Sequence, residues 1–259
     1  MKKAIKLTAI ILVSLLVLML IAFAIIFSIF SSTVKKEVFD STKLATSEFQ
    51  IEVFDYNGNL ISDKNQFNNQ HINIKDLNQK TIDAFISIED KNFYNHSGVN
   101  YKRMMKALFK NLTSGKVKEG ASTISQQLIK NTHLTSERTF TRKFNEILSA
   151  LNIERNYNKD EIIEAYLNTI YLSHGCYGVK TAAEKYFGKN VKDLNVAECA
   201  CIAAITKAPT KNDPLKYPDN NKDRRDYILK KMLEWNYINQ EQYEEALNYK
   251  LVFTNSEEY

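Results

Sequence analysis

A long uncharged apolar stretch near the start of the chain sets the strongest limit on how this protein can fold. It extends from Leu7 to Phe30, with only Thr8, Ser14 and Ser28 as polar interruptions. At 1.5 Å per residue, a helix over this stretch is roughly 36 Å long, enough to cross a bilayer core. A cleavable signal peptide has a shorter apolar region and a small-residue cleavage site, so an uncleaved anchor fits better. We therefore predict a transmembrane helix over residues 7–30.

The charges beside this stretch predict its orientation. Residues 1–6 contain three lysines, whereas Lys35 and Lys36 follow the stretch next to Glu37. Basic residues favour the cytoplasmic side of a membrane helix. We expect residues 1–6 to form a cytoplasmic tail and the chain after the anchor to lie outside the cytoplasm.

The rest of the chain reads as a stalk followed by a helical domain. Alternating apolar residues at 49–53 and the turn dipeptide Asn57-Gly58 predict a short β-hairpin within a stalk at 31–70. From there the apolar spacing is helical, and only 7 glycines and 3 prolines occur in 259 residues. We predict a mainly α fold, with one domain at 71–250 and a C-terminal tail at 251–259.

Charge and cysteine usage narrow the classes of partner. The formal net charge of +5 suits an anionic lipid surface or a phosphate-bearing substrate. No basic tract is dense enough to predict nucleic-acid binding. Cys176, Cys199 and Cys201 form no metal-ligand pattern, so we interpret them as small buried apolar residues and predict no metal site built from them.

One carboxylate follows a helical apolar stripe. Ile82, Phe85 and Ile86 share one helix face, and the next position on that face is Glu89. Burial penalises the charged form of a carboxylate, which suits a residue that abstracts protons. The alternative is that the helix ends near Ile88 or Glu89 and leaves the carboxylate in solvent.

Two later segments have two open interpretations each. Tyr101–Leu112 mixes apolar and basic residues, which indicates either a helix at a membrane interface or an ordinary amphipathic helix. After a cap at Ser122 or Thr123, the side chains of Thr123, Gln127 and Lys130 share a helix face. That polar strip is either solvated or a set of donors for phosphate and sugar oxygens.

A third helix is predicted over about Arg138–Glu154. Arg142 and Glu146 are four residues apart on one face, with Lys143 adjacent. On local grounds this is an exposed ion pair that stabilises the helix by roughly 0.3–0.5 kcal/mol. Three further helix starts are predicted from an Asn followed three residues later by Glu or Gln, at Asn158, Asn195 and Asn239.

Four spaced segments together resemble one enzyme family. Glu89–Gly98 matches the pattern Glu-Asp-x-x-Phe-x-x-His-x-Gly, and Gly120–Leu128 matches Gly-Gly/Ala-Ser-Thr-Ile-Thr-Gln-Gln-Leu. Arg142–Glu146 matches Arg-Lys-x-x-Glu, and Tyr166–Asn168 begins a fourth motif. These patterns are typical of the peptidoglycan glycosyltransferase family, which comprises monofunctional transglycosylases and the catalytic N-terminal domain of bifunctional penicillin-binding proteins. Departures are Ser125 for Thr, Ser173 for Gly and a loosely similar fifth motif at 203–209.

The resemblance implies polymerisation of lipid II in bacterial cell-wall biosynthesis, which maintains cell shape. The growing chain is the donor and lipid II the acceptor, giving an inverted β-1,4 glycan and releasing undecaprenyl pyrophosphate. It also implies a lysozyme-like helical lobe with a smaller membrane-proximal lobe, in a single-pass protein of the bacterial cell membrane. Expected partners are lipid II, the growing glycan and membrane lipids, with other cell-wall synthesis proteins as further candidates.

The resemblance also implies roles for particular residues. Glu89 is the expected catalytic base, and Lys130, Arg142 and Lys143 are expected to hold the pyrophosphate. Glu146, the second catalytic glutamate, orients these cations or acceptor contacts. Further residues expected to bind substrate by positioning and hydrogen bonding are Asp90, Thr123, Gln127 and Asn168. A divalent cation (Mg or Mn) at the pyrophosphate would be held mainly by substrate oxygens, with help from Asp90.

Two other functions remain to be compared with this one. A glycoside hydrolase needs a carboxylic acid and a second carboxylate, and has no use for a cationic cluster. A non-catalytic membrane-anchored scaffold would need neither glutamate. Because the chain ends soon after the glycosyltransferase region, we expect a monofunctional transglycosylase without a transpeptidase domain, unless the sequence is a fragment of a bifunctional protein.

Overall fold

The computed structural model describes residues 71–114, 120–133 and 139–254, together with a few residues of the apolar stretch. By its contacts the chain divides into two units, Met1–Phe39 and Asp40–Tyr259. In the first unit the described residues are helical: Val13, Ser14, Val17, Leu18, Ile21 and Ile25. The predicted β-hairpin, and the predicted transmembrane helix as a whole, lie outside the described residues. Within the described residues, no helix is both long and apolar enough to cross a membrane.

The described part of the second unit is mainly helical, as the sequence predicts. Its α-helices are α3 (Gln79–Glu89), α4 (Tyr101–Ser114), α5 (Ile124–His133), α6 (Phe140–Asn156), α7 (Lys159–Thr169), α8 (Val179–Phe187), α9 (Val196–Ile205), α10 (Pro218–Glu234) and α11 (Gln240–Asn248). Three short 3-10 turns accompany them: η1 (Ile74–Asp76), η2 (Phe93–Asn95) and η3 (Val191–Asp193). Between residues 71 and 254, the described β-pairing is a single bridge from Tyr171 to Tyr177.

Local capping determines several helix ends. Reciprocal side-chain and backbone hydrogen bonds close a capping box at each predicted asparagine, Asn158, Asn195 and Asn239. Gly188 caps the C-terminal end of α8, where it adopts the left-handed conformation with φ of 61°. α10 begins at Pro218, and proline is well suited to the first turn of a helix.

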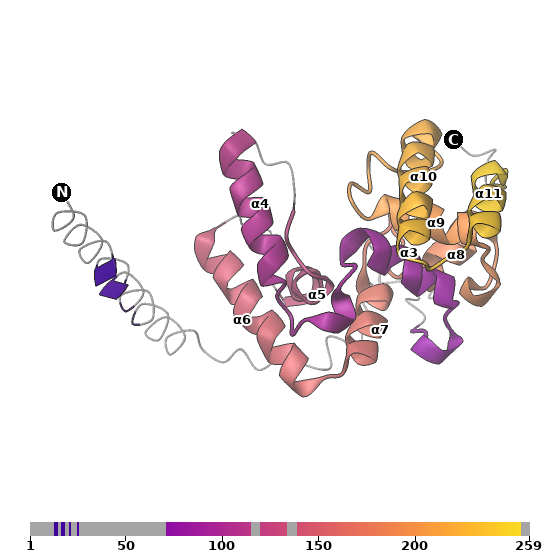
Figure 1. Cartoon of the computed structure of the whole chain (residues 1–259). Coiled ribbons are helices and arrows are strands. Elements are labelled where there is room, and N and C mark those ends of the chain that lie inside the picture. Colours follow the sequence, from indigo (N-terminus) through magenta and orange to yellow (C-terminus); the bar gives the residue numbers. More distant parts are fainter. Residues whose placement is uncertain are drawn as a thin grey trace, which may run out of the picture. The chain divides into compact units, whose positions relative to one another are not determined.

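The larger packed group of helices surrounds α9 (Figure 1). Apart from Glu198 in its first turn this helix is apolar on all sides, and its residues from Ala197 to Ile205 are buried. α3 and α10 pack closely against it and against each other, while α8 and α11 also contact it. A helix with no polar face has to be covered on all sides, and this requirement places α9 at the centre.

A second group forms around α5, which packs against α6 and α7 (Figure 1). Ile124, Leu128 and Ile129 of α5 are completely buried and form its apolar face. α7 also contacts η1 and α8, so it joins this group to the helices around α9.

The three cysteines are free and buried, as predicted. Burial raises the pKa of the Cys176 thiol to about 11 and that of Cys199 to about 12. At neutral pH both are therefore protonated and unreactive, in keeping with a packing role.

Candidate active site

Glu89 lies at the C-terminal end of α3, where the helix emerges from the core. Ile82, Phe85 and Ile86 are buried, as the apolar stripe predicts. Asp83 is also buried, so α3 is enclosed on more sides than one stripe requires. The helix ends at Glu89 itself, yet the side chain of Glu89 is only half-exposed. Each of the two alternative interpretations is thus partly right.

Two neutral donors hold the carboxylate of Glu89, one on each oxygen. Gln127 of α5 donates from Nε2 to Oε2 at 2.8 Å. Thr206, the residue that caps the end of α9, donates from Oγ1 to Oε1 at 2.7 Å. The same Thr206 hydroxyl lies 2.9 Å from the carbonyl oxygen of Ala203, which is its alternative acceptor. The carboxylate is therefore fixed in direction by two elements distant in sequence.

Tyr166 of α7 holds the side chain of Gln127 in place. Its hydroxyl donates to Oε1 of Gln127 at 3.3 Å, so it orients the amide that binds Glu89. Burial raises the pKa of Tyr166 well above its usual value, and the nearby charges of Glu89 and Asp90 raise it further. Tyr166 is therefore a neutral donor throughout the physiological pH range.

Two arginines lie near Glu89. The guanidinium of Arg103, from α4, donates to the backbone carbonyl of Glu89. Arg224 of α10 is partly buried, and this burial lowers its pKa, while the charge of Glu89 acts in the opposite direction. Nε of Arg224 is buried with no hydrogen-bond partner among the described residues.

Glu146 has a different environment. It lies on α6 and is only 1% exposed. Its carboxylate binds Nη1 of Arg142 at 3.1 Å and the ammonium of Lys143. The local interpretation of Arg142 and Glu146 as an exposed pair is therefore wrong, because packing against α5 covers this face of α6. Nε of Arg142 is buried without a hydrogen-bond partner in the described part of the chain.

The start of α5 links the two glutamates. Lys143 donates to Oγ of Ser122 at 2.9 Å, just before the helix begins. Gln127, which binds Glu89, follows five residues after Ser122 in the chain. A displacement of the start of α5 would therefore alter the contacts of both carboxylates.

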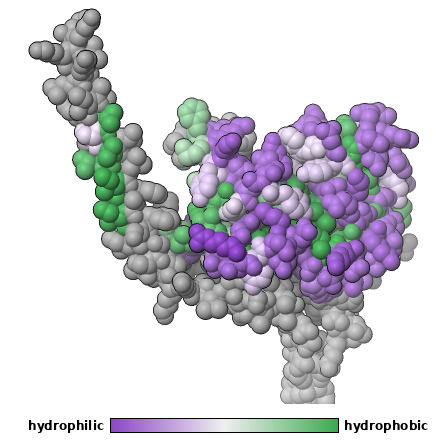
Figure 2. Space-filling model, turned by 60° about the horizontal axis from the view of Figure 1, so that its bottom comes forward, coloured by the Kyte–Doolittle hydropathy of each residue, from purple (hydrophilic) through white to green (hydrophobic). Residues whose placement is uncertain are grey.

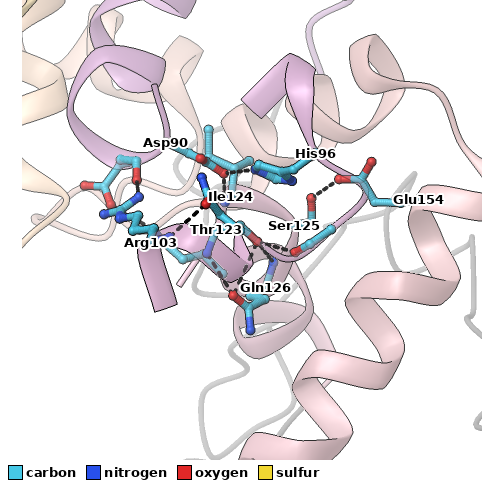
Figure 3. A network of polar contacts seen from close by, with 12 residues as sticks. Asp90, His96, Arg103, Thr123, Ile124, Ser125, Gln126 and Glu154 are labelled. Carbon is cyan, nitrogen blue, oxygen red and sulfur yellow. Dashed lines mark hydrogen bonds and ion pairs between the residues drawn. The ribbon is translucent and has the colours of Figure 1, made fainter. Parts of the chain in front are cut away.

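Asp90 is enclosed by contacts of the fold (Figure 3). It is 1% exposed, and its Oδ2 accepts from His96 Nε2 at 2.8 Å and from the Ile124 amide at 3.2 Å. A carboxylate at the first amide of a helix stabilises it through the helix dipole. Asp90 thereby connects the end of α3 to the start of α5. Its predicted substrate contact stays a prediction.

Thr123 is the N-cap of α5 and is completely buried. In Figure 3 its side chain lies among those that hold the start of this helix. Its hydroxyl donates to the Gly98 carbonyl at 2.6 Å, and its amide donates to Oε1 of Gln126 at 3.0 Å. Gln126 returns an amide hydrogen bond to the Thr123 hydroxyl at 3.2 Å. These contacts use the polar atoms of Thr123 within the fold.

Asn168 is bound within the fold, whereas Lys130 is exposed to solvent. The amide of Asn168 makes two hydrogen bonds of 2.9 Å with the backbone of Ile72, one in each direction, and one to the carbonyl of Glu164. It is therefore a clamp between α7 and the segment before α3. Lys130 is exposed on α5, where its ammonium is accessible to an external anion.

The described residues contain no ready-made ligand set for a divalent cation: no group of three potential ligands among His, Cys, Asp and Glu occurs in them. Asp90 offers one buried oxygen, Oδ1, without a partner among them, while Oδ2 is occupied. Magnesium is usually bound through one or two carboxylates together with substrate phosphates and water, so the expected cation at the pyrophosphate stays a prediction.

Sequence reasoning missed Tyr166, Thr206 and Arg224 as parts of this site. Tyr166 belongs to the fourth motif, but its buried apolar surroundings suggest a core residue. Thr206 lies in the segment 203–209, whose similarity to the family is loose. Arg224 reads as an ordinary charge of an amphipathic helix. No local pattern places any of these side chains beside Glu89.

Comparison with known proteins identifies the family. The family model described as Transglycosylase matches residues 57–233, more than half of the chain. Penicillin-binding protein 1A of Pseudomonas aeruginosa is 44% identical over 200 residues, covering 77% of this chain and 24% of that protein. Penicillin-binding protein 1F of Bacillus subtilis is 43% identical over 187 residues, covering 72% and 26%.

Two further matches cover a similar share of this chain. Penicillin-binding protein 1A of Aquifex aeolicus is 43% identical over 208 residues, covering 80% of this chain and 29% of that protein. A crystal structure of Penicillin-Binding Protein 1A from Haemophilus influenzae matches 71% of this chain and 18% of its own, at 27% identity and a TM-score of 0.44. The chain spans 24–29% of the length of the three relatives. The chain belongs to the transglycosylase family.

Proposed function

We propose that the chain is a peptidoglycan glycosyltransferase that polymerises lipid II into β-1,4-linked glycan and releases undecaprenyl pyrophosphate. One observation carries this proposal. A half-buried glutamate held by neutral donors lies in the same domain as a buried glutamate held by two cations. The first arrangement suits a base, and the second suits charge stabilisation of a phosphate leaving group.

Glu89 takes the proton of the acceptor 4-hydroxyl as that oxygen attacks the anomeric carbon of the donor. While Glu89 is charged, the Thr206 hydroxyl donates to it at 2.7 Å. Once Glu89 holds the proton, it can donate to the Thr206 oxygen, whose own hydrogen turns to the Ala203 carbonyl at 2.9 Å. Both protonation states of Glu89 thus have a hydrogen-bond partner.

The bond that breaks joins the donor sugar to its pyrophosphate, which leaves with the electron pair and needs cations instead of a proton. Arg142 and Lys143 are held in place by Glu146, and Lys130 is exposed. The unpartnered Nε of Arg142 is a donor that a phosphate oxygen would satisfy. Because attack is opposite to the leaving group, the anomeric centre inverts.

A hydrolase acting on finished glycan is the second candidate, and the environment of Glu146 argues against it. Hydrolysis of a glycosidic bond needs a carboxylic acid that donates a proton to the leaving oxygen. The carboxylate of Glu146 is already occupied by Arg142 and Lys143, so it is not free to approach a leaving oxygen. Glu89 would have to supply both functions, so transfer is the better explanation.

The enzyme acts at the bacterial cell membrane, with residues 7–30 as the anchor and the catalytic domain outside the cytoplasm. α4 belongs to a smaller membrane-proximal lobe. Met105 and Phe109 of α4 are 60% and 72% exposed, among lysines at 102, 106 and 110. Apolar side chains mixed with ammonium groups suit the headgroup region of a bilayer. Figure 2 shows hydrophobic residues reaching a surface that is otherwise mainly hydrophilic.

Replacing both Met105 and Phe109 by Ser tests this position. In a chain without residues 1–30, the double substitution should reduce binding to anionic liposomes several-fold, because it removes two exposed apolar side chains. The measurement is partition by vesicle sedimentation. An unchanged partition would show that α4 does not contact the bilayer.

The experiment that tests the proposed function offers the protein two substrates. Purified lipid II should give polymer and free undecaprenyl pyrophosphate, and finished uncross-linked glycan should remain intact. Cleavage of glycan without polymer from lipid II would favour the hydrolase. Polymer formed equally well by a Glu89→Gln variant would remove Glu89 from the mechanism.

A further inference from the structure

The loop between α7 and α8 bends through three successive residues with positive φ. They are Ser173 at 66°, His174 at 47° and Gly175 at 73°. Glycine adopts this conformation freely, whereas a residue with a side chain is strained in it. Position 173 is also one at which the chain departs from the family pattern, with Ser for Gly. Contacts with the rest of the fold therefore have to stabilise Ser173 and His174 in this conformation.

Asp213, in the segment after α9, makes such contacts. It is only 2% exposed. Its Oδ2 accepts from the Ser173 hydroxyl at 3.1 Å and lies 2.7 Å from Nε2 of His174, an ion-pair distance. Its Oδ1 accepts from the amides of Leu215 and Lys216 at 2.9 and 3.2 Å. One buried carboxylate thus joins the loop between α7 and α8 to the segment after α9.

A compact turn connects Asp213 to Thr206. Within it, the amide of Asn212 donates to the Ala208 carbonyl at 2.9 Å. The side chain of Asn212 donates to the carbonyl of Ala204, in the last turn of α9, at 3.1 Å. Thr206 is the C-cap residue of the same helix. A displacement of Asp213 would therefore alter the position of Thr206 through a few short hydrogen bonds.

We propose that Asp213 is a positioning residue for the reaction, which holds Thr206 and thereby the carboxylate of Glu89. The inference rests on the proposed function, in which Glu89 must face the attacking hydroxyl. The hydroxyl of Thr206 donates to Glu89 Oε1 at 2.7 Å, so it is the link between the two carboxylates. None of Ser173, His174 and Asp213 lines the pocket beside Glu89, so they act on the reaction through Thr206.

The test is a double-mutant cycle in the full chain. Asp213→Ala should lower the kcat of polymerisation by about tenfold, as expected for loss of the Thr206 hydroxyl, and leave the KM for lipid II unchanged. In a Thr206→Val background the same substitution should cause little further loss, because the contact through which Asp213 acts is already absent. A kcat that does not fall, or a loss of the same size in both backgrounds, would overturn the proposal.

A milder variant covers the case in which Asp213→Ala does not fold. In His174→Asn the backbone conformation stays accessible, because asparagine tolerates positive φ, but the shorter side chain no longer reaches Asp213. Its loss of kcat should be smaller and should again disappear in the Thr206→Val background; a loss that persists there contradicts the proposal. The control is Glu198→Gln, which breaks a buried contact with Lys189 at the opposite end of α9. It should keep its kcat per folded molecule in both backgrounds.

An NMR measurement separates this inference from the proposed function. The isotope-labelled methyl group of Thr206 reports on its own surroundings, so no turnover is needed. Its resonance should shift in Asp213→Ala and in His174→Asn and should keep its position in Glu198→Gln. That pattern supports the positioning role even if the wild type makes no polymer. A resonance that stays in place, or that shifts equally in Glu198→Gln, overturns the role whether or not polymer forms.

Discussion

Glu89 of α3 and Glu146 of α6 are both glutamates of the same helical domain, but their surroundings differ. Glu89 is half-exposed and receives hydrogen bonds from an amide and a hydroxyl. Glu146 is 1% exposed and receives two cations. Neutral donors leave a carboxylate able to accept a proton, whereas cations favour its charged form. The type of hydrogen-bond or ionic partner, more than burial, therefore separates a candidate base from a charge-holding residue.

The largest expected effect follows Glu89→Gln. An amide cannot accept the proton, so the initial rate of polymer formation should fall by about 10²–10⁴-fold. The free energy of unfolding, measured by urea titration, should change little, because the amide can keep one of the two hydrogen bonds. If stability falls as much as activity, Glu89 is a structural residue and the comparison fails.

Glu146→Gln should affect both properties. It leaves Arg142 and Lys143 without their anion, and we expect a rate loss of about 10²-fold. The free energy of unfolding should fall by about 2 kcal/mol, less than for a fully enclosed pair because Lys143 is 41% exposed.

A matched control exists for this substitution. Glu198 is likewise 1% exposed and binds Lys189 Nζ at 2.6 Å, but it caps α9 away from the cluster. Glu198→Gln should lose a similar amount of stability and keep its rate per folded molecule. A rate loss equal to that of Glu146→Gln would mean that destabilisation alone explains both variants.

Thr206→Val removes one of the two neutral donors to Glu89 without changing the shape of the side chain. The rate should fall by about tenfold. Thr169→Val is the control, since that buried hydroxyl donates to Ala165 within α7 at 2.7 Å. An unchanged rate in Thr206→Val would show that this hydroxyl does not hold the Glu89 carboxylate in its working position.

The smallest effect concerns Tyr166 in alkaline solution. Burial raises the pKa of Tyr166 in the folded protein, so its neutral form stabilises the fold fully below the unfolded pKa of about 10. That contribution is lost as the pH rises above this value, by up to about 1.4 kcal/mol per pH unit. Urea titrations at pH 9 and 11 should show a smaller loss for Tyr166→Phe than for wild type. Equal losses would show that Tyr166 does not limit alkaline stability.

Local chemistry predicted helix starts better than side-chain environments. The asparagine capping boxes are confirmed because each requires only residues three apart in sequence. Ser125, by contrast, is buried against Glu154 of α6, which no local pattern indicates (Figure 3). Thr123 and Asn168 were expected to face substrate, whereas the contacts found for them belong to the fold. A polar residue in a motif can serve either role, and spacing does not distinguish them.

The mainly helical fold of the described residues, many of its helix ends and the family follow from the amino-acid sequence alone. These depend on periodicity, on caps formed within a few residues and on the order of spaced motifs. The burial and the partners of each glutamate depend on tertiary packing. Gln127 and Thr206 reach Glu89 across 38 and 117 positions of sequence, and Glu146 is buried by packing of α6 on α5. Burial and hydrogen-bond partners arise from packing between distant segments, so a local pattern cannot specify them.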